Sequence, residues 1–109
     1  MHAVGIRNEL VDQHPWLPAS VYKAFLEAKK ISDSDLTQVA ALKVTLPWLT
    51  AELEKTKQVM GEDYWPYGID ANRHTLETMA RYSYEQGLAT RLLGVEEMFA
   101  ESALSKTKV

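Results

Sequence analysis

Cysteine is missing from this chain of 109 residues. Its absence excludes disulfides, thiolate metal sites and cysteine nucleophiles, and it fits either a reducing or an oxidising compartment. Long hydrophobic runs are missing too, so the sequence offers neither the roughly 20 apolar residues of a membrane helix nor the apolar core of a signal peptide. A basic surplus is also absent, because the net charge is -3. We therefore expect neither a nucleic acid nor a membrane as a partner, since phosphate binding needs positive charge gathered on one face.

What is present has the composition of an ordinary soluble globular segment, with 46% hydrophobic and 25% charged residues. The length leaves room for one domain at most. The pattern predicts a mainly α fold with a single strand at residues 2–7, where the chain is partly β-branched. No second run has strand character, and one strand cannot satisfy its backbone groups alone. The strand should therefore pair with another chain or with a missing part of its own sheet, which is the first indication of a fragment.

Helices are predicted after this strand from apolar spacing and from start and stop residues. Pro15 suits the first turn of a helix, Asp33 begins a second one, and Gly61 and Gly87 end later ones. The expected helices cover residues 15–30, 33–45, 47–60, 71–86 and 95–99. Residues 101–109 are polar and typical of a chain end, so we expect them to be disordered.

An aromatic segment between two of these helices is unusual for a connector. Tyr64, Trp65 and Tyr67 lie between Gly61 and Gly68, and such large amphipathic rings need both an apolar surface and a polar partner. We expect them to pack against something beyond the turn itself.

Few residues carry candidate chemistry, and each has a plainer interpretation. His14 precedes Pro15 and suits a helix cap, whereas His2 lies on the expected strand. Arg73, Glu77 and Arg81 fall on one helix face, either as surface ion pairs or as an anion-binding cluster.

The acidic and histidine patterns argue against a metal centre and an acid–base pair. The adjacent acids Glu62-Asp63 and Glu96-Glu97 diverge, so neither pair forms a general acid–base couple on its own. The three histidines lack metal-ligand spacing, and we expect no metal and no other cofactor.

Several motifs, in a consistent order from residue 1 to about 100, resemble the C-terminal third of the 4,5-dihydroxyphthalate decarboxylase family. They are His14-Pro15-Trp16-Leu17, Val21-Tyr22-Lys23-Ala24-Phe25, Thr45-Leu46-Pro47-Trp48, Gly61-Glu62-Asp63-Tyr64-Trp65-Pro66-Tyr67-Gly68, Asn72-Arg73-His74-Thr75-Leu76-Glu77 and Arg81-Tyr82-Ser83-Tyr84-Glu85-Gln86-Gly87-Leu88. The resemblance implies a larger two-lobed α/β fold of the periplasmic-binding-protein type II kind, of which residues 1–100 would be the C-terminal segment. The missing N-terminal part would then be the partner of the strand.

The reaction implied by this resemblance removes one carboxylate from 4,5-dihydroxyphthalate to give 3,4-dihydroxybenzoate and carbon dioxide. Such chemistry needs cations for the carboxylates, a base near the catechol and an acid near the ring. The resemblance suggests His2 as the catalytic proton donor or catechol contact, and Arg73 with His74 as contacts to the small aromatic dicarboxylate. Tyr64, Trp65 and Tyr67 would line the substrate pocket or pack the lobe.

Two other functions stay open at this point. The same architecture serves solute-binding proteins of transport systems, because fold does not imply function. The segment could instead be a helical interaction module that dimerises through its first strand. Exposed apolar surface could also lead copies of the fragment to form a homo-oligomer. We expect a cytoplasmic location, or a periplasmic one if the full-length chain carries a signal peptide, and we expect the fragment alone to be inactive.

Overall fold

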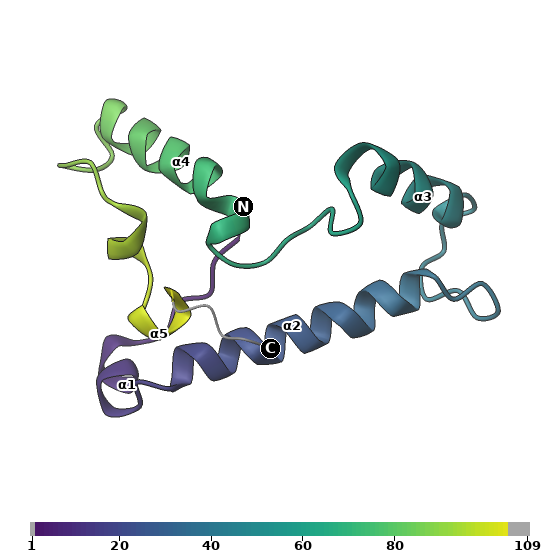
Figure 1. Ribbon diagram of the computed structural model, residues 1–109, viewed down its shortest axis with the longest axis horizontal. Helices are drawn as coiled ribbons and strands as arrows, with labels where there is room; N and C mark the ends of the chain where they lie inside the picture. The colour runs from purple at the N-terminus through teal and green to yellow at the C-terminus, as the bar shows by residue number, and fades with distance from the viewer. Residues whose placement is uncertain (1, 105–109) are drawn as a thin grey trace. The chain divides into compact units, whose positions relative to one another are not determined.

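All regular elements of residues 2–104, the part of the chain that the computed structural model describes, are helices. In chain order they are α1 (Asn8–Gln13), α2 (Leu17–Leu36), α3 (Leu49–Met60), the 3-10 helix η1 (Asp70–Asn72), α4 (Arg73–Glu85), the 3-10 helix η2 (Val95–Met98) and α5 (Glu101–Leu104) (Figure 1). The mainly α character predicted from the sequence is confirmed. The chain divides into unit 1, which comprises Met1–Lys23 and Tyr67–Val109, and unit 2, Ala24–Pro66.

The expected strand at residues 2–7 is not formed, because these residues adopt neither helix nor strand in the structure. The physical reason is the lack of a second strand, which the sequence already indicated. A strand is stable only when a neighbouring strand accepts and donates its backbone hydrogen bonds, and the described chain contains no second strand.

Helix α1 was not expected, because the first helix predicted from the sequence begins at residue 15. In the structure the Arg7 carbonyl accepts hydrogen bonds from the backbone N–H groups of Leu10 and Val11 at 3.0 and 3.2 Å. The His14 N–H donates to Leu10 at 2.9 Å and closes the last turn. This short helix leads directly into α2.

Helix α2 is longer than predicted and replaces the expected break near residue 31. Asp33 does not cap a new helix; its carboxylate accepts a 2.7 Å hydrogen bond from Lys29, one turn earlier on the same helix. An ion pair at this spacing supports helix continuation. The helix ends where Thr37 donates both its N–H and its hydroxyl to the Ser34 carbonyl, and the expected helix at 33–45 is absent.

The buried core of the described chain lies in unit 1. Helix α4 packs against η1 and η2, and the buried hydrophobic residues are Leu76, Ala80 and Val95. Leu76 and Ala80 lie four residues apart on α4, so they share one face of the helix. Val95 is the first residue of η2. Apolar contact between these two elements is therefore the main stabilising feature of unit 1.

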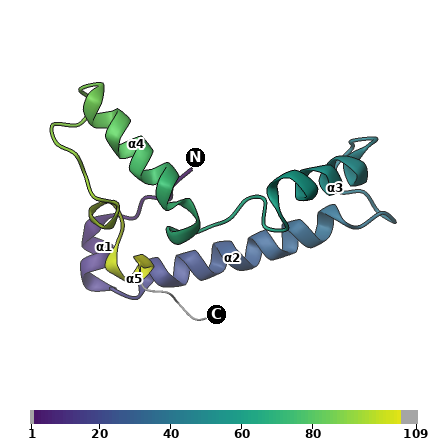
Figure 2. The ribbon, with the colours of Figure 1, turned by 45° about the horizontal axis from the view of Figure 1, so that its top comes forward.

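The C-terminal end of the described chain is helical rather than disordered over residues 101–104. Both Figure 1 and Figure 2 show α5 beside α1 and the first turns of α2, all of them parts of unit 1. The disorder predicted for 101–109 differs from the structure in this first part, and residues 105–109 lie outside the described residues.

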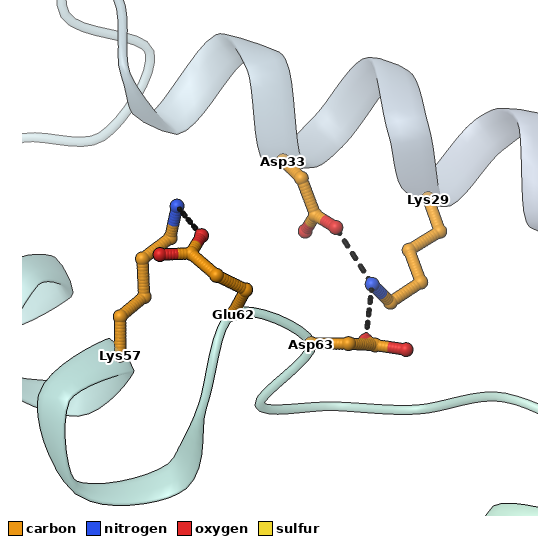
Figure 3. Close-up of polar contacts among 5 residues, drawn as sticks. All are labelled: Lys29, Asp33, Lys57, Glu62 and Asp63. Atoms are coloured by element: carbon orange, nitrogen blue, oxygen red, sulfur yellow. Dashed lines mark hydrogen bonds and ion pairs between the residues drawn. The ribbon is translucent and has the colours of Figure 1, made fainter.

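Unit 2 contains the second part of α2, α3 and the loop that follows α3. Lys29 on α2 binds Asp33 on the same helix and also reaches Asp63 on the loop, with its Nζ 3.0 Å from the Asp63 carboxylate (Figure 3). Lys57 on α3 binds Glu62 at 2.9 Å. These contacts attach the start of the aromatic segment to two helices, and the carboxylates raise the pKa of Lys29, the Asp33 contact most strongly.

Apolar side chains of unit 2 remain largely exposed. None of the three buried hydrophobic residues belongs to this unit, whereas Trp48 and Val59 are 76% and 78% exposed. A shallow pocket beside Trp48 is lined mostly by apolar residues, among them Leu42, Leu46 and Pro47. Exposed apolar surface of this kind is typical of a segment that packs against further protein.

Gly68 offers a test of packing in unit 1. Its φ of +96° is a conformation that other residues rarely adopt, and a Cβ atom there would lie 2.7 Å from the Tyr22 hydroxyl oxygen. Gly68→Ala should therefore destabilise unit 1 through both backbone strain, about 1–2 kcal/mol, and steric overlap, about 1–3 kcal/mol. Urea unfolding followed by circular dichroism would measure the loss.

Gly87→Ala is the matched control for this substitution, because Gly87 has a φ of +73° with no atom within 4 Å of an added Cβ. It should show the strain without the overlap, and Tyr22→Phe should recover part of the stability of Gly68→Ala by removing the overlapping oxygen. Equal losses at Gly68 and Gly87, with no recovery, would contradict the close approach of Tyr22.

Candidate functional site

The start of α4 carries two of the predicted substrate-binding residues, Arg73 and His74. The chain turns into this helix through Gly68 and η1, and the Asn72 side chain donates a 2.8 Å hydrogen bond back to the Gly68 carbonyl. This contact closes the turn before the helix begins. The local sequence thus places Arg73 and His74 in the first turn of α4.

Arg73 is bound to a carboxylate of η2. Its Nη1 lies 2.8 Å from Glu96 Oε1 and 3.9 Å from Glu77 Oε1. The Glu96 hydrogen bond is the main cause of a raised pKa for Arg73. The pKa of Glu96 is lowered, first by a hydrogen bond from its own backbone and then by Arg73. Both side chains remain accessible to solvent, at 41% and 60% exposure.

On α4, Glu77 does not bridge Arg73 and Arg81. Glu77 approaches Arg73, but Arg81 instead lies 3.9 Å from Glu85, and its guanidinium also stands 5.1 Å from the centre of the Tyr82 ring. The closest partner of Arg73, Glu96, lies 23 residues further along the chain. Helical spacing could not reveal this contact.

A second arginine–glutamate contact holds η2, and sequence analysis did not identify it. Arg91 binds both carboxylate oxygens of Glu97, at 2.8 and 3.1 Å. The same carboxylate accepts a 2.8 Å hydrogen bond from the Gly94 N–H, while the Glu97 N–H donates to the Gly94 carbonyl. The Glu97 bond to the Gly94 N–H is one half of a capping box; the other half is missing because glycine has no side chain to accept the Glu97 N–H. The pairing with Arg91 depends on the loop between α4 and η2.

The other predicted site residues are distributed over both units. In unit 1, His2 and His74 are exposed, and Tyr67 is 38% exposed. Figures 1 and 2 both show the N-terminal segment running between the first turn of α4 and α1. In unit 2, Tyr64 is half-buried and Trp65 is 58% exposed.

Within residues 2–104, His, Asp and Glu side chains form no group of three or more that could hold a metal ion. No helix in the same range has the length and hydrophobicity needed to cross a membrane.

Comparison with known proteins relates the chain to a class of enzymes, the decarboxylases. One relative is a protein from Comamonas testosteroni named 4,5-dihydroxyphthalate decarboxylase, to which the chain is 36% identical over 109 residues. The similarity covers 100% of this chain and 33% of the relative, so the chain spans about a third of the relative's length. No protein-family model matches the chain. The resemblance to the 4,5-dihydroxyphthalate decarboxylase family is thus confirmed along the whole chain.

The Glu97 contacts predict a specific dependence of stability on pH. Hydrogen bonds from Arg91 and the Gly94 backbone lower the pKa of Glu97 from 4.5 to about 2. A carboxylate with a lowered pKa in the folded state stabilises the fold above its ordinary pKa, and this stabilisation is lost as the pH falls toward the folded-state value. Glu97→Gln should therefore flatten the decline in thermal stability between pH 4.5 and about 2.

Thermal unfolding of both proteins across this pH range, followed by circular dichroism, would measure the difference. Glu85→Gln is the control of equal charge, because Glu85 lies 3.9 Å from its arginine rather than in direct contact. It should leave the decline nearly unchanged. Identical pH profiles for wild type and Glu97→Gln would show that this contact contributes nothing.

Proposed function

We propose that this chain is the C-terminal part of a decarboxylase that acts on a small aromatic dicarboxylate, 4,5-dihydroxyphthalate. The observation that carries the proposal is the 36% identity along the entire chain to a protein of that name. The product would be 3,4-dihydroxybenzoate, with carbon dioxide as the second product. We place the protein in the cytoplasm.

The remaining part of the relative's length supports a larger architecture. We assign the whole protein a two-lobed α/β fold of the periplasmic-binding-protein type II kind, in which residues 2–7 complete a sheet in the first lobe. The absence of a partner strand for residues 2–7 within the described residues and the exposed apolar side chains of unit 2 favour such packing. The isolated chain is then inactive, and copies of it would associate through the same apolar surface.

The reaction follows from the position of the carboxylate on the ring. The leaving carboxylate sits on a carbon para to a phenol oxygen, and loss of the phenol proton pushes electron density onto that carbon. A general acid donates a proton to the same carbon. The bond to the carboxylate carbon then breaks, carbon dioxide leaves, and its bonding electrons restore the aromatic ring. The phenol oxygen then regains its proton from the base that removed it, so the scheme consumes one proton per turnover, the one added to the ring carbon, and calls for no other co-reactant.

We assign the roles as follows. His2 donates the proton or contacts the catechol, and Arg73 with His74 binds a substrate carboxylate. All three residues belong to unit 1, which favours a shared site for His2, Arg73 and His74. Tyr64, Trp65 and Tyr67 provide aromatic surface for the ring of the substrate or for packing of the lobe.

Turnover by the complete gene product tests this function. Carbon dioxide release from 4,5-dihydroxyphthalate should be detectable with the complete product and absent with the 109-residue chain alone. His2→Ala should lower kcat by about 10²–10⁴-fold, the usual contribution of general acid catalysis. Arg73→Ala should raise KM by about 10- to 100-fold, because it removes a charged hydrogen bond to the substrate.

Two matched substitutions serve as controls. His14→Ala removes a histidine whose ring packs against Trp16, and Arg81→Ala removes an arginine from the same helix as Arg73. Both should keep near-normal turnover. Binding of the compound without carbon dioxide release would favour a solute-binding protein, and wild-type kinetics in His2→Ala and Arg73→Ala would refute the assigned residues.

A further inference from the structure

Glu96 occupies the side of Arg73 that a carboxylate ligand would need. The Arg73 Nη1 to Glu96 Oε1 distance of 2.8 Å is that of a charge-assisted hydrogen bond. Glu77 lies further away, at 3.9 Å, and Asp70 adds negative charge that also raises the pKa of Arg73. An incoming carboxylate therefore meets an arginine whose charge is already compensated.

The Glu96 contact is nevertheless easy to break. Both side chains are substantially exposed, at 41% and 60%, and exposed ion pairs contribute little because water solvates the separated charges well. A carboxylate on a ligand offers Arg73 the same oxygen acceptors that Glu96 offers. The two groups are chemically equivalent competitors for one guanidinium.

The backbone that carries Glu96 is held independently of Arg73. On one side of it, Val95 is buried at 3% exposure. On the other side, Glu97 is bound by Arg91 through two contacts and by the Gly94 N–H. The Glu96 side chain can consequently rotate away from Arg73 while η2 keeps its place against α4.

We propose that Glu96 is an intramolecular competitor that occupies Arg73 in the free protein and is displaced by a carboxylate of the aromatic ligand. This inference rests on the proposed role of Arg73 in carboxylate binding. Glu96 thereby sets the affinity of the site, since each binding event must first break the Arg73–Glu96 contact. In this role Glu96 acts only through Arg73.

Phthalate is a suitable probe, because it carries the two carboxylates and cannot react through a phenol. Its affinity for the 109-residue chain would be measured by titration followed with NMR, for wild type and for Glu96→Gln. The substitution should tighten binding by about two- to fivefold, the factor that corresponds to the strength of an exposed ion pair. When Arg73→Gln is also present, Glu96→Gln should no longer tighten phthalate binding, because the guanidinium for which Glu96 and phthalate compete is gone.

Two further Glu→Gln substitutions, which change the net charge by the same amount, distinguish competition for Arg73 from a general change in the electrostatic potential at the site. Glu77→Gln should tighten phthalate binding less than Glu96→Gln, because Glu77 stands 3.9 Å from Arg73. Glu85→Gln, next to Arg81 on the same helix, should leave the affinity nearly unchanged. Equal gains in all three variants, unchanged or weaker binding in Glu96→Gln, or no phthalate binding by wild type and Glu96→Gln, would overturn the proposal.

The test of the Glu96 competitor and the test of the decarboxylase function can fail independently of each other. Tighter phthalate binding in Glu96→Gln without any carbon dioxide release by the complete gene product would leave the competitor in place and refute the decarboxylase. Carbon dioxide release with an unchanged KM in Glu96→Gln would support the decarboxylase and refute the competitor.

Discussion

The contact between α4 and η2 is the constraint on which the rest of unit 1 depends. Leu76 and Ala80 on α4 and Val95 on η2 are the buried hydrophobic residues of the described chain. A core this small stabilises only modestly, because the hydrophobic contribution follows the area removed from water. The polar contacts around it therefore matter for geometry. Arg91 and the Gly94 backbone fix Glu97, and this places Glu96 opposite Arg73.

The same geometry links stability to recognition at the start of α4. Arg73 serves as a partner for η2 in the free protein, and in our proposal it also binds the substrate. The two roles compete for one guanidinium. A ligand therefore gains affinity from Arg73 only if its contact with Arg73 is stronger than the Glu96 contact that it displaces. Unit 2 contrasts with this arrangement, because ion pairs of Lys29 and Lys57 hold its loop while its apolar side chains stay exposed.

Local elements were predictable where a single residue type decides the backbone. The helix ends at Gly61 and Gly87 were expected, and both glycines have positive φ angles. The helix expected at 71–86 is present as η1 and α4. Predictions failed where one residue allows two conformations. Asp33 suits a helix start, yet pairing with Lys29 keeps it inside α2, and residues 8–13 form α1 where no helix was expected.

The sequence by itself determined the helical character, the positions of several helix ends and the relationship to the decarboxylase family. These properties depend on neighbouring residues or on motifs that can be read in order along the chain. Only the tertiary structure decided which carboxylate faces Arg73, because Glu96 comes from a separate element 23 residues away. It likewise decided that residues 2–7 form no strand, since strand formation depends on a partner and not on the strand's own residues.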